Sequence, residues 1–169
     1  MPHESIHPET EHTPELRFFN VDAMSNDEIV TLSRGLTGAL DSADVGGGEQ
    51  YRNIAGEMLI QLDADIRDLA SRDPERVRNL VEQCMQSDKG ADHELALGIT
   101  PSLASYDYAF IRDVMISLLV DGLGGANEEA LIAIPRMMRD RLTPDQVADF
   151  NAHLQARDQE PMTPARPEN

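Results

Sequence analysis

The chain has 169 residues, with 31 Asp and Glu against 14 Lys and Arg, and a formal net charge of −17. This length suits one domain, and a surface so acidic repels phosphate backbones, which disfavours ordinary nucleic-acid binding. Cys84 is the only cysteine, which excludes an internal disulfide, and the lack of a secretory leader or a long apolar run predicts a cytoplasmic protein with no membrane partner.

Residues 1–24 differ in composition from the rest of the chain. They hold five acids, one base and three of the five histidines, and they contain few apolar residues. Such a segment buries too little apolar surface to fold, so we predict a largely disordered acidic arm over residues 1–24. Phe18 and Phe19 form its aromatic pair. Two hypotheses remain open for them: they cap the apolar end of the first helix, or they bind a partner.

The helical part of the chain is predicted to begin after Ser25. Ser25 and Glu28 stand three positions apart, as in a capping box, and predict a helix that begins near residue 26. Residues 41–48 are rich in glycine and predict a loop. A second helix is predicted over residues 49–71, because apolar residues recur there at helical spacing: Ile54, Met58, Leu62, Ile66 and Leu69.

Residues 73–103 and 107–137 are two copies of one pattern, shifted by 34 positions. Both copies contain apolar residues at i, i+3, i+4, i+7 and i+8, which predicts an amphipathic helix in each. These residues are Val77, Leu80, Val81, Cys84 and Met85 in the first copy and Ile111, Val114, Met115, Leu118 and Leu119 in the second. A glycine-bearing turn and a second apolar stripe follow, so each unit is predicted to be a helix, a turn and a helix. Cys84 is interpreted as a core residue.

Pro101 and Pro135 occupy matching positions inside the second apolar stripe of the two copies. A proline in a helix removes one amide donor, and its ring collides with the carbonyl four residues earlier. We therefore expect each proline to kink its helix or to restart it.

The end of the chain is predicted to contain one more helix. Thr143 and Pro144 resemble a cap followed by proline at the first helical position, as Asp73 and Pro74 do earlier in the chain, and they predict a closing helix over residues 144–157. The proline-rich residues 159–169 predict a disordered tail. The helical domain is thus expected over residues 25–158.

A period of this size built from paired helices resembles the HEAT and armadillo-like α-helical repeats. The resemblance covers about residues 49–156. It rests on the paired helices, on Asp73 and Asp107, and on Arg78 and Arg112, which in such repeats often form a polar ladder from unit to unit. It implies an all-α fold: a short right-handed α-solenoid of antiparallel helix pairs with about six to seven helices. The period is shorter than in most HEAT units, and the prolines lie in the second helix instead of the first.

No catalytic, cofactor-binding or metal-binding motif stands out, so no such residue and no cofactor are assigned. Asp63, Asp65 and Asp68 resemble a carboxylate cluster on one predicted helix, but Asp65 and Asp68 are three positions apart on its exposed side and are interpreted as a solvated face. The histidines of the arm match no metal-ligand spacing: His3, His7 and His12.

The candidate partner-binding surface comes from the repeat geometry. The second helices of a solenoid commonly line one surface, and Glu94 and Glu128 recur at the start of these helices. Arg136 and Arg139 belong to the basic region of an otherwise acidic body. Each has a simpler explanation as well, since carboxylates favour a helix N-terminus and the arginines can pair with nearby acids such as Asp140.

The leading hypothesis is a non-catalytic helical-repeat interaction module that binds a protein partner, with a basic protein as the natural complement of its charge. One alternative is an acidic mimic of nucleic acid that inhibits a basic protein. The other is an enzyme similar to the HEAT-like DNA glycosylases, which would need Asp73, Asp107 or Asp121 in an arginine-lined groove. The charge of the chain disfavours the enzyme.

Overall fold

The computed structural model describes residues 18–42, 48–122 and 141–158. Over these ranges the chain is all-α, as predicted, with six α-helices and no strand. The α-helices are α1 (Asn26–Ser42), α2 (Glu49–Arg72), α3 (Pro74–Met85), α4 (Gly90–Ile99), α5 (Tyr108–Ser117) and α7 (Pro144–Asp158). The shorter elements are the 3₁₀ helices η1 (Val21–Ala23) and η3 (Thr100–Leu103) and the π-helical turn η4 (Leu118–Gly122).

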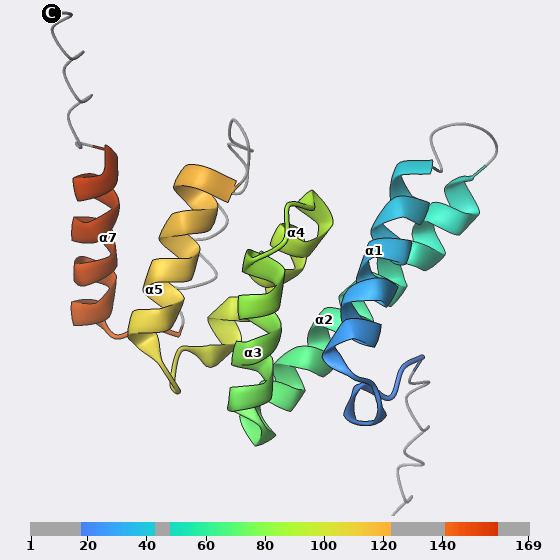
Figure 1. The fold of residues 1–169 in the computed structure, drawn as a ribbon, viewed down its shortest axis with the longest axis horizontal. Coiled ribbons are helices and arrows are strands. Elements are labelled where there is room, and N and C mark those ends of the chain that lie inside the picture. The colour runs from blue at the N-terminus through green and yellow to red at the C-terminus, as the bar shows by residue number, and fades with distance from the viewer. Residues whose placement is uncertain (1–17, 43–47, 123–140, 159–169) are drawn as a thin grey trace, which may run out of the picture.

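The helices lie side by side along the longest axis of the molecule (Figure 1). α1 and α2 form a pair at one end, α3 and α4 form the next pair, and α5 and α7 follow toward the other end. α4 also packs against α1 and α2, and α7 packs against α5. The core therefore runs from pair to pair along the row.

Three of the helices begin where their cap residues predict. At α1, the amide of Glu28 donates to Ser25 Oγ at 3.2 Å, and the amide of Ser25 donates to Glu28 Oε2 at 2.7 Å. Asp73 caps α3 by accepting a hydrogen bond from the amide of Arg76 at 3.2 Å. Thr143 caps α7 in the same way, through the amide of Gln146 at 3.2 Å. Each cap satisfies an amide that has no partner inside its helix.

The 34-residue shift reappears in the core. Four apolar positions of α3 and their four equivalents in and after α5 are all buried: Val77, Leu80, Val81, Cys84, Ile111, Val114, Met115 and Leu118. Asp107 caps α5 through the amide of Phe110 at 3.1 Å, as Asp73 caps α3. The first helices of the two units therefore share both their start and their buried face. The second helix predicted for the later unit, with Pro135, lies outside the described residues.

Pro101 acts as the sequence predicts. α4 ends at Ile99, and the chain continues as the 3₁₀ helix η3, with Pro101 in its first turn and buried. The tighter winding of η3 is compatible with a proline near its start, where an amide would have no partner inside the helix. The proline thus converts the end of the second helix into a separate buried turn.

Residues 18–24 differ from the domain division expected from composition, which placed them in the arm. They form η1 and its flanks, and Val21 is buried against the core. Phe19 is partly buried against the same core, whereas Phe18 is 54% exposed. Composition could not predict this packing because its hydrogen-bond partners lie on helices about 50 residues further along the chain.

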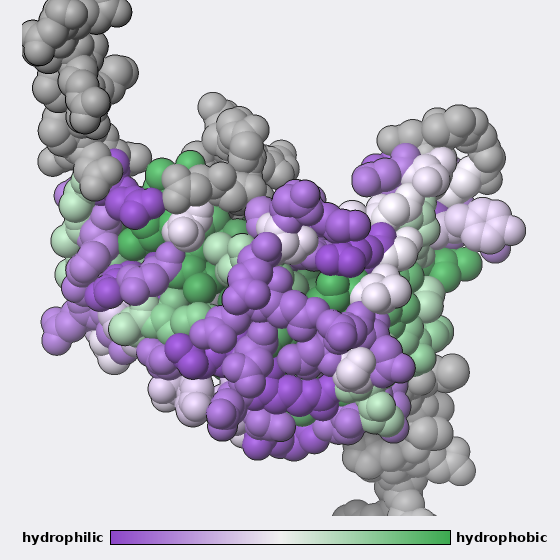
Figure 2. Space-filling view, in the orientation of Figure 1, coloured by the Kyte–Doolittle hydropathy of each residue, from purple (hydrophilic) through white to green (hydrophobic). Residues whose placement is uncertain are grey.

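The surface is hydrophilic over much of the face seen in Figure 2, especially over α3. Hydrophobic residues reach the surface along α5 and at the end of the row formed by α1 and α2. The exposed large apolar residues of α2 are Tyr51, Ile54 and Ile60.

Candidate functional site

Two arginines hold the N-terminal segment against the helices. The guanidinium of Arg76, at the start of α3, donates to the carbonyls of Val21 and Met24 and to the side chain of Asn26. Arg72, at the end of α2, donates from Nη1 to Asp22 Oδ1 at 2.8 Å. Charged donors are stronger than neutral ones, so these contacts fix the course of the segment across α2.

A hollow of about 490 Å³ lies between this segment and the C-terminal half of α2. We call it the N-terminal pocket. Its chemically distinctive lining consists of two aromatic rings, three carboxylates and one guanidinium: Phe18, Phe19, Asp22, Asp65, Asp68 and Arg72. The pocket is therefore acidic on one side and aromatic on another.

The single guanidinium of the N-terminal pocket is already engaged. Arg72 Nη1 lies 2.8 Å from Asp22 Oδ1, and Nη2 lies 3.3 Å from Asp68 Oδ2. The hydrogen bond to Asp22 raises the pKa of Arg72. One carboxylate, that of Asp65, is left without a cationic partner in the pocket.

Asp65 is only half satisfied. Its Oδ1 accepts a hydrogen bond from Gln61 Nε2 at 3.0 Å, but its Oδ2 is buried and has no hydrogen-bond partner. A buried acceptor without a donor costs free energy, more so when it carries charge. The expected solvated face is therefore wrong for Asp65, which is half-buried, and correct for Asp68, which is exposed.

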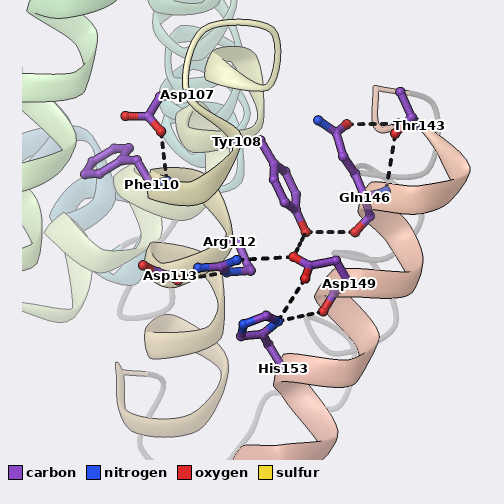
Figure 3. A network of polar contacts seen from close by, with 9 residues as sticks. All are labelled: Asp107, Tyr108, Phe110, Arg112, Asp113, Thr143, Gln146, Asp149 and His153. Atoms are coloured by element: carbon purple, nitrogen blue, oxygen red, sulfur yellow. Dashed lines mark hydrogen bonds and ion pairs between the residues drawn. The ribbon is translucent and has the colours of Figure 1, made fainter.

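A second polar network joins α5 to α7 (Figure 3). Tyr108 Oη lies 2.8 Å from both Asp149 Oδ2 and the carbonyl of Gln146, and Arg112 Nη1 lies 3.2 Å from Asp149 Oδ2. His153 Nδ1 lies 2.8 Å from the carbonyl of Asp149. The hydrogen bond from Tyr108 lowers the pKa of Asp149, whereas burial, followed by the bond to Asp149, raises the pKa of Tyr108 to about 12.

A smaller hollow of about 330 Å³ adjoins this network and is lined in part by Ser117, His153 and Arg157. A serine nucleophile requires a base within hydrogen-bond reach. No hydrogen bond joins the described side chains of Ser117 and His153. The imidazole of His153 instead contacts the carbonyl and the carboxylate of Asp149 on its own helix. The network is thus organised to tie α7 to α5.

Replacing Tyr108 with phenylalanine tests this structural role. Loss of the hydroxyl should cost about 1 kcal/mol and loosen α7, because one bridge to Asp149 and Gln146 disappears. Hydrogen exchange should show faster exchange of the α7 amides, with the amides of α2 unchanged. Equal acceleration in both helices would contradict a local tie.

No known protein family, curated protein or solved structure matches the chain. Across the ranges that the structure describes, no helix has the length and apolar character needed to cross a membrane. In the same ranges, no group of three or more His, Cys, Asp and Glu side chains is placed to hold a metal ion.

The residues of the candidate partner-binding surface are only partly described. Glu94 lies on α4 and is exposed. Glu128, Arg136 and Arg139 lie outside the described residues, so the structure does not test whether these four side chains share a surface. The N-terminal pocket was not predicted. Its signal in the sequence was the aromatic pair at Phe18 together with the aspartates of α2.

The aspartates named for an enzyme have structural roles where they are described. Asp73 and Asp107 accept hydrogen bonds from the third residue beyond them and so cap α3 and α5. Asp107 Oδ2 also lies 3.7 Å from Arg78 Nε, and the Arg78 guanidinium stacks on the ring of Phe110. The side chain of Asp121 is outside the described residues.

Two further groups are buried for structural reasons. Cys84 is fully buried, and burial raises the pKa of its thiol to about 12, which makes the thiolate scarce and supports its prediction as a core residue. Asp63 is half-buried where α2 meets α4, and burial raises its pKa to about 6 although the positive charge of Arg67 opposes the shift. A Cβ atom on Gly98 would lie 2.8 Å from Asp63 Oδ2, so the glycine makes room for this carboxyl group.

Proposed function

We propose that the chain is a short right-handed α-solenoid that serves as a non-catalytic interaction module for a basic protein partner. The solenoid is supported by the repeated first helix, whose buried positions recur after 34 residues. It is also supported by two arginines at equivalent positions, each of which contacts a later helix: Arg78 contacts Asp107, the cap of α5, and Arg112 contacts Asp149 of α7. Contacts between successive units of this kind are expected in stacked repeats, and so they favour the proposal.

The observation that carries the proposed partner is the balance of charge on the described residues. They include 21 acids and 10 bases. Four arginines form ion pairs with described carboxylates of the chain itself. Arg34 pairs with one such carboxylate, and two carboxylates pair with each of the others: Arg72, Arg78 and Arg112. The surplus charge is therefore negative after the internal pairs are formed, and a positively charged protein surface is its complement.

The test is to capture the partner with the immobilised full chain and then rebuild the complex from purified components. We expect a saturable complex with a basic protein whose affinity falls when the salt concentration rises from about 50 mM to about 150 mM, because salt screens exposed charges. A complex with a neutral or acidic protein, or no saturable complex at either concentration, would contradict the proposal.

Duplex DNA added as a competitor separates this function from nucleic-acid mimicry. If the chain binds the basic partner away from the partner's own DNA-binding site, the partner can bind the chain and DNA at the same time. Mutually exclusive binding would instead support the acidic mimic, whose carboxylates occupy the positions of phosphates.

A further inference from the structure

We propose that the N-terminal pocket receives an arginine side chain of the protein partner. This proposal rests on the proposed function and adds the place and the chemistry of one contact. It begins from the shape of the pocket, a hollow of about 490 Å³ between the segment that starts at Phe18 and the helix that carries Asp65. A hollow of that size has room for a guanidinium and the methylene groups behind it.

The charges of the pocket select a cation. Asp22, Asp65 and Asp68 contribute three carboxylates, and Arg72 offsets only part of their charge. Arg72 is held by Asp22 and Asp68 together, so it is not available to recruit an anion. Asp65 is the carboxylate that remains for an incoming group, and its buried Oδ2 lacks a donor.

The aromatic rings select a flat cation with an apolar stem. Phe18 is 54% exposed beside the carboxylates, and its ring centroid lies 6.4 Å from that of Phe19. A guanidinium stacks on an aromatic face and donates several hydrogen bonds within its own plane, whereas an ammonium does neither as well. Because Asp65 Oδ2 is buried, reaching it requires the lining side chains to shift.

A divalent metal is a poorer occupant of the N-terminal pocket. No metal-holding group of His, Cys, Asp and Glu forms among the residues that the structure describes, and the oxygens of Asp22 and Asp68 already contact Arg72. The aromatic side of the pocket offers a metal ion no ligand, whereas it offers a guanidinium a surface for stacking.

The probe for this site is the blocked tripeptide acetyl-Gly-Arg-Gly-amide, titrated into the full-length chain and followed by amide chemical shifts. We expect shifts concentrated at residues 18–22 and 61–72. The lysine counterpart should bind several-fold more weakly, and the citrulline and glutamate counterparts should not bind. Binding of the glutamate peptide at these residues would overturn the proposal, as would equal binding of the citrulline peptide.

Variants then test the individual contacts. Asp65→Asn should weaken binding of the arginine peptide about tenfold, which is typical of a hydrogen bond to a charged group, and Phe18→Ala about threefold. Glu57→Gln is the matched control, because Glu57 is an exposed acid of α2 outside the pocket and its replacement removes the same charge. An equal effect of Asp65→Asn and Glu57→Gln would show general attraction to an acidic surface and would refute the pocket. The amide spectrum of each variant establishes that it is folded.

The outcomes separate the pocket from the proposed function. If the protein partner binds both the wild-type chain and Asp65→Asn with equal affinity, the pocket assignment fails and the interaction module stands. If no basic partner exists, the proposed function fails whatever the tripeptide does. Binding of the tripeptide only after removal of residues 1–17 would also overturn the proposal, because the occupant would then be the chain's own N-terminal segment.

Discussion

Replacing Asp92 with alanine is expected to lower the free energy of unfolding by about 2–3 kcal/mol. Asp92 is 1% exposed and lies in the first turn of α4. It accepts two hydrogen bonds from Arg34 of α1, with Nε to Oδ1 at 2.7 Å and Nη2 to Oδ2 at 2.6 Å. Such a two-point pair between a guanidinium and a buried carboxylate fixes the orientation of the two helices as well as their distance. Chemical denaturation of the full chain provides the measurement.

The pH dependence of the destabilisation by Asp92→Ala follows from the direction in which the pKa of Asp92 is shifted. The hydrogen bond from Arg34 lowers the pKa of Asp92 below its ordinary value of 3.8. The stabilisation is therefore present above about pH 4 and is lost as the pH falls through the lower pKa of the folded state. The difference between wild type and the alanine variant should shrink toward acid pH and stay constant near neutral pH.

Glu94→Ala serves as the control, since Glu94 is an exposed acid two residues further along α4. Its stability should change by no more than about 0.5 kcal/mol. Arg34→Met should destabilise the protein more than Asp92→Ala, because it leaves the buried carboxylate without its cation. The proposed role of the pair would be refuted if Asp92→Ala and Glu94→Ala had equal effects.

The second large effect concerns Asp63, whose replacement by asparagine should stabilise the protein at about pH 8. Burial raises the pKa of Asp63 from 3.8 to about 6, so at that pH the folded chain carries a carboxylate in an unfavourable place. Asparagine removes the charge and keeps the size. We expect the free energy of unfolding to rise by about 1–2 kcal/mol. This is less than the roughly 3 kcal/mol that corresponds to the full shift in the pKa of Asp63, because the carboxyl group is partly exposed.

The size of the effect changes with pH because the pKa of Asp63 is raised, whereas the pKa values of Asp92 and Asp149 are lowered. The folded state binds the Asp63 proton more tightly than the unfolded state, so the wild type loses stability as the pH rises from about 4 to about 6.5. Asp63→Asn should equal the wild type below about pH 4 and exceed it above about pH 6.5. Denaturation curves measured across this range give the difference. A constant difference at all pH values would contradict a titrating carboxyl group.

A control for Asp63→Asn is available on the same helix. Glu57→Gln removes one negative charge from an exposed position of α2, and so it reports the relief of general repulsion in an acidic chain. If Glu57→Gln gave a pH-dependent gain in stability as large as that of Asp63→Asn, the effect would be due to net charge and not to the burial of Asp63.

Local features of the fold could be predicted from the sequence because they depend on neighbouring residues. Ser25 and Glu28 lie three positions apart, and their reciprocal hydrogen bonds begin α1 where the pattern predicts. Asp73 caps α3 through the amide of Arg76, three positions further on, which is again a contact between near neighbours in the sequence. Pro101 ends α4, since the restriction on its backbone does not depend on the rest of the chain. Cys84 was correctly assigned to the core from its helical spacing.

Features that depend on pairing between distant segments could not be predicted. Arg34 and Asp92 are separated by 58 positions, and neither belongs to a recognisable motif. Asp63, Asp65 and Asp68 looked alike in the sequence, but α4 covers the first and the N-terminal segment lies beside the other two. Their different environments arise from what packs against α2, which the spacing of acids along one helix does not contain.

The hydrogen bonds that Arg76 donates to the N-terminal segment have a consequence for shortened forms of the chain. Its contact with the carbonyl of Val21 spans 55 positions of the chain, and closing a loop of that length costs roughly 3–4 kcal/mol of conformational entropy. The contacts that hold residues 18–24 are divided between α2, through Arg72, and α3, through Arg76. A fragment that ended before α3 would keep residues 18–22, all of α2 and the ion pair between Arg72 and Asp22, but it would lose the hydrogen bonds from Arg76 to the carbonyls of Val21 and Met24.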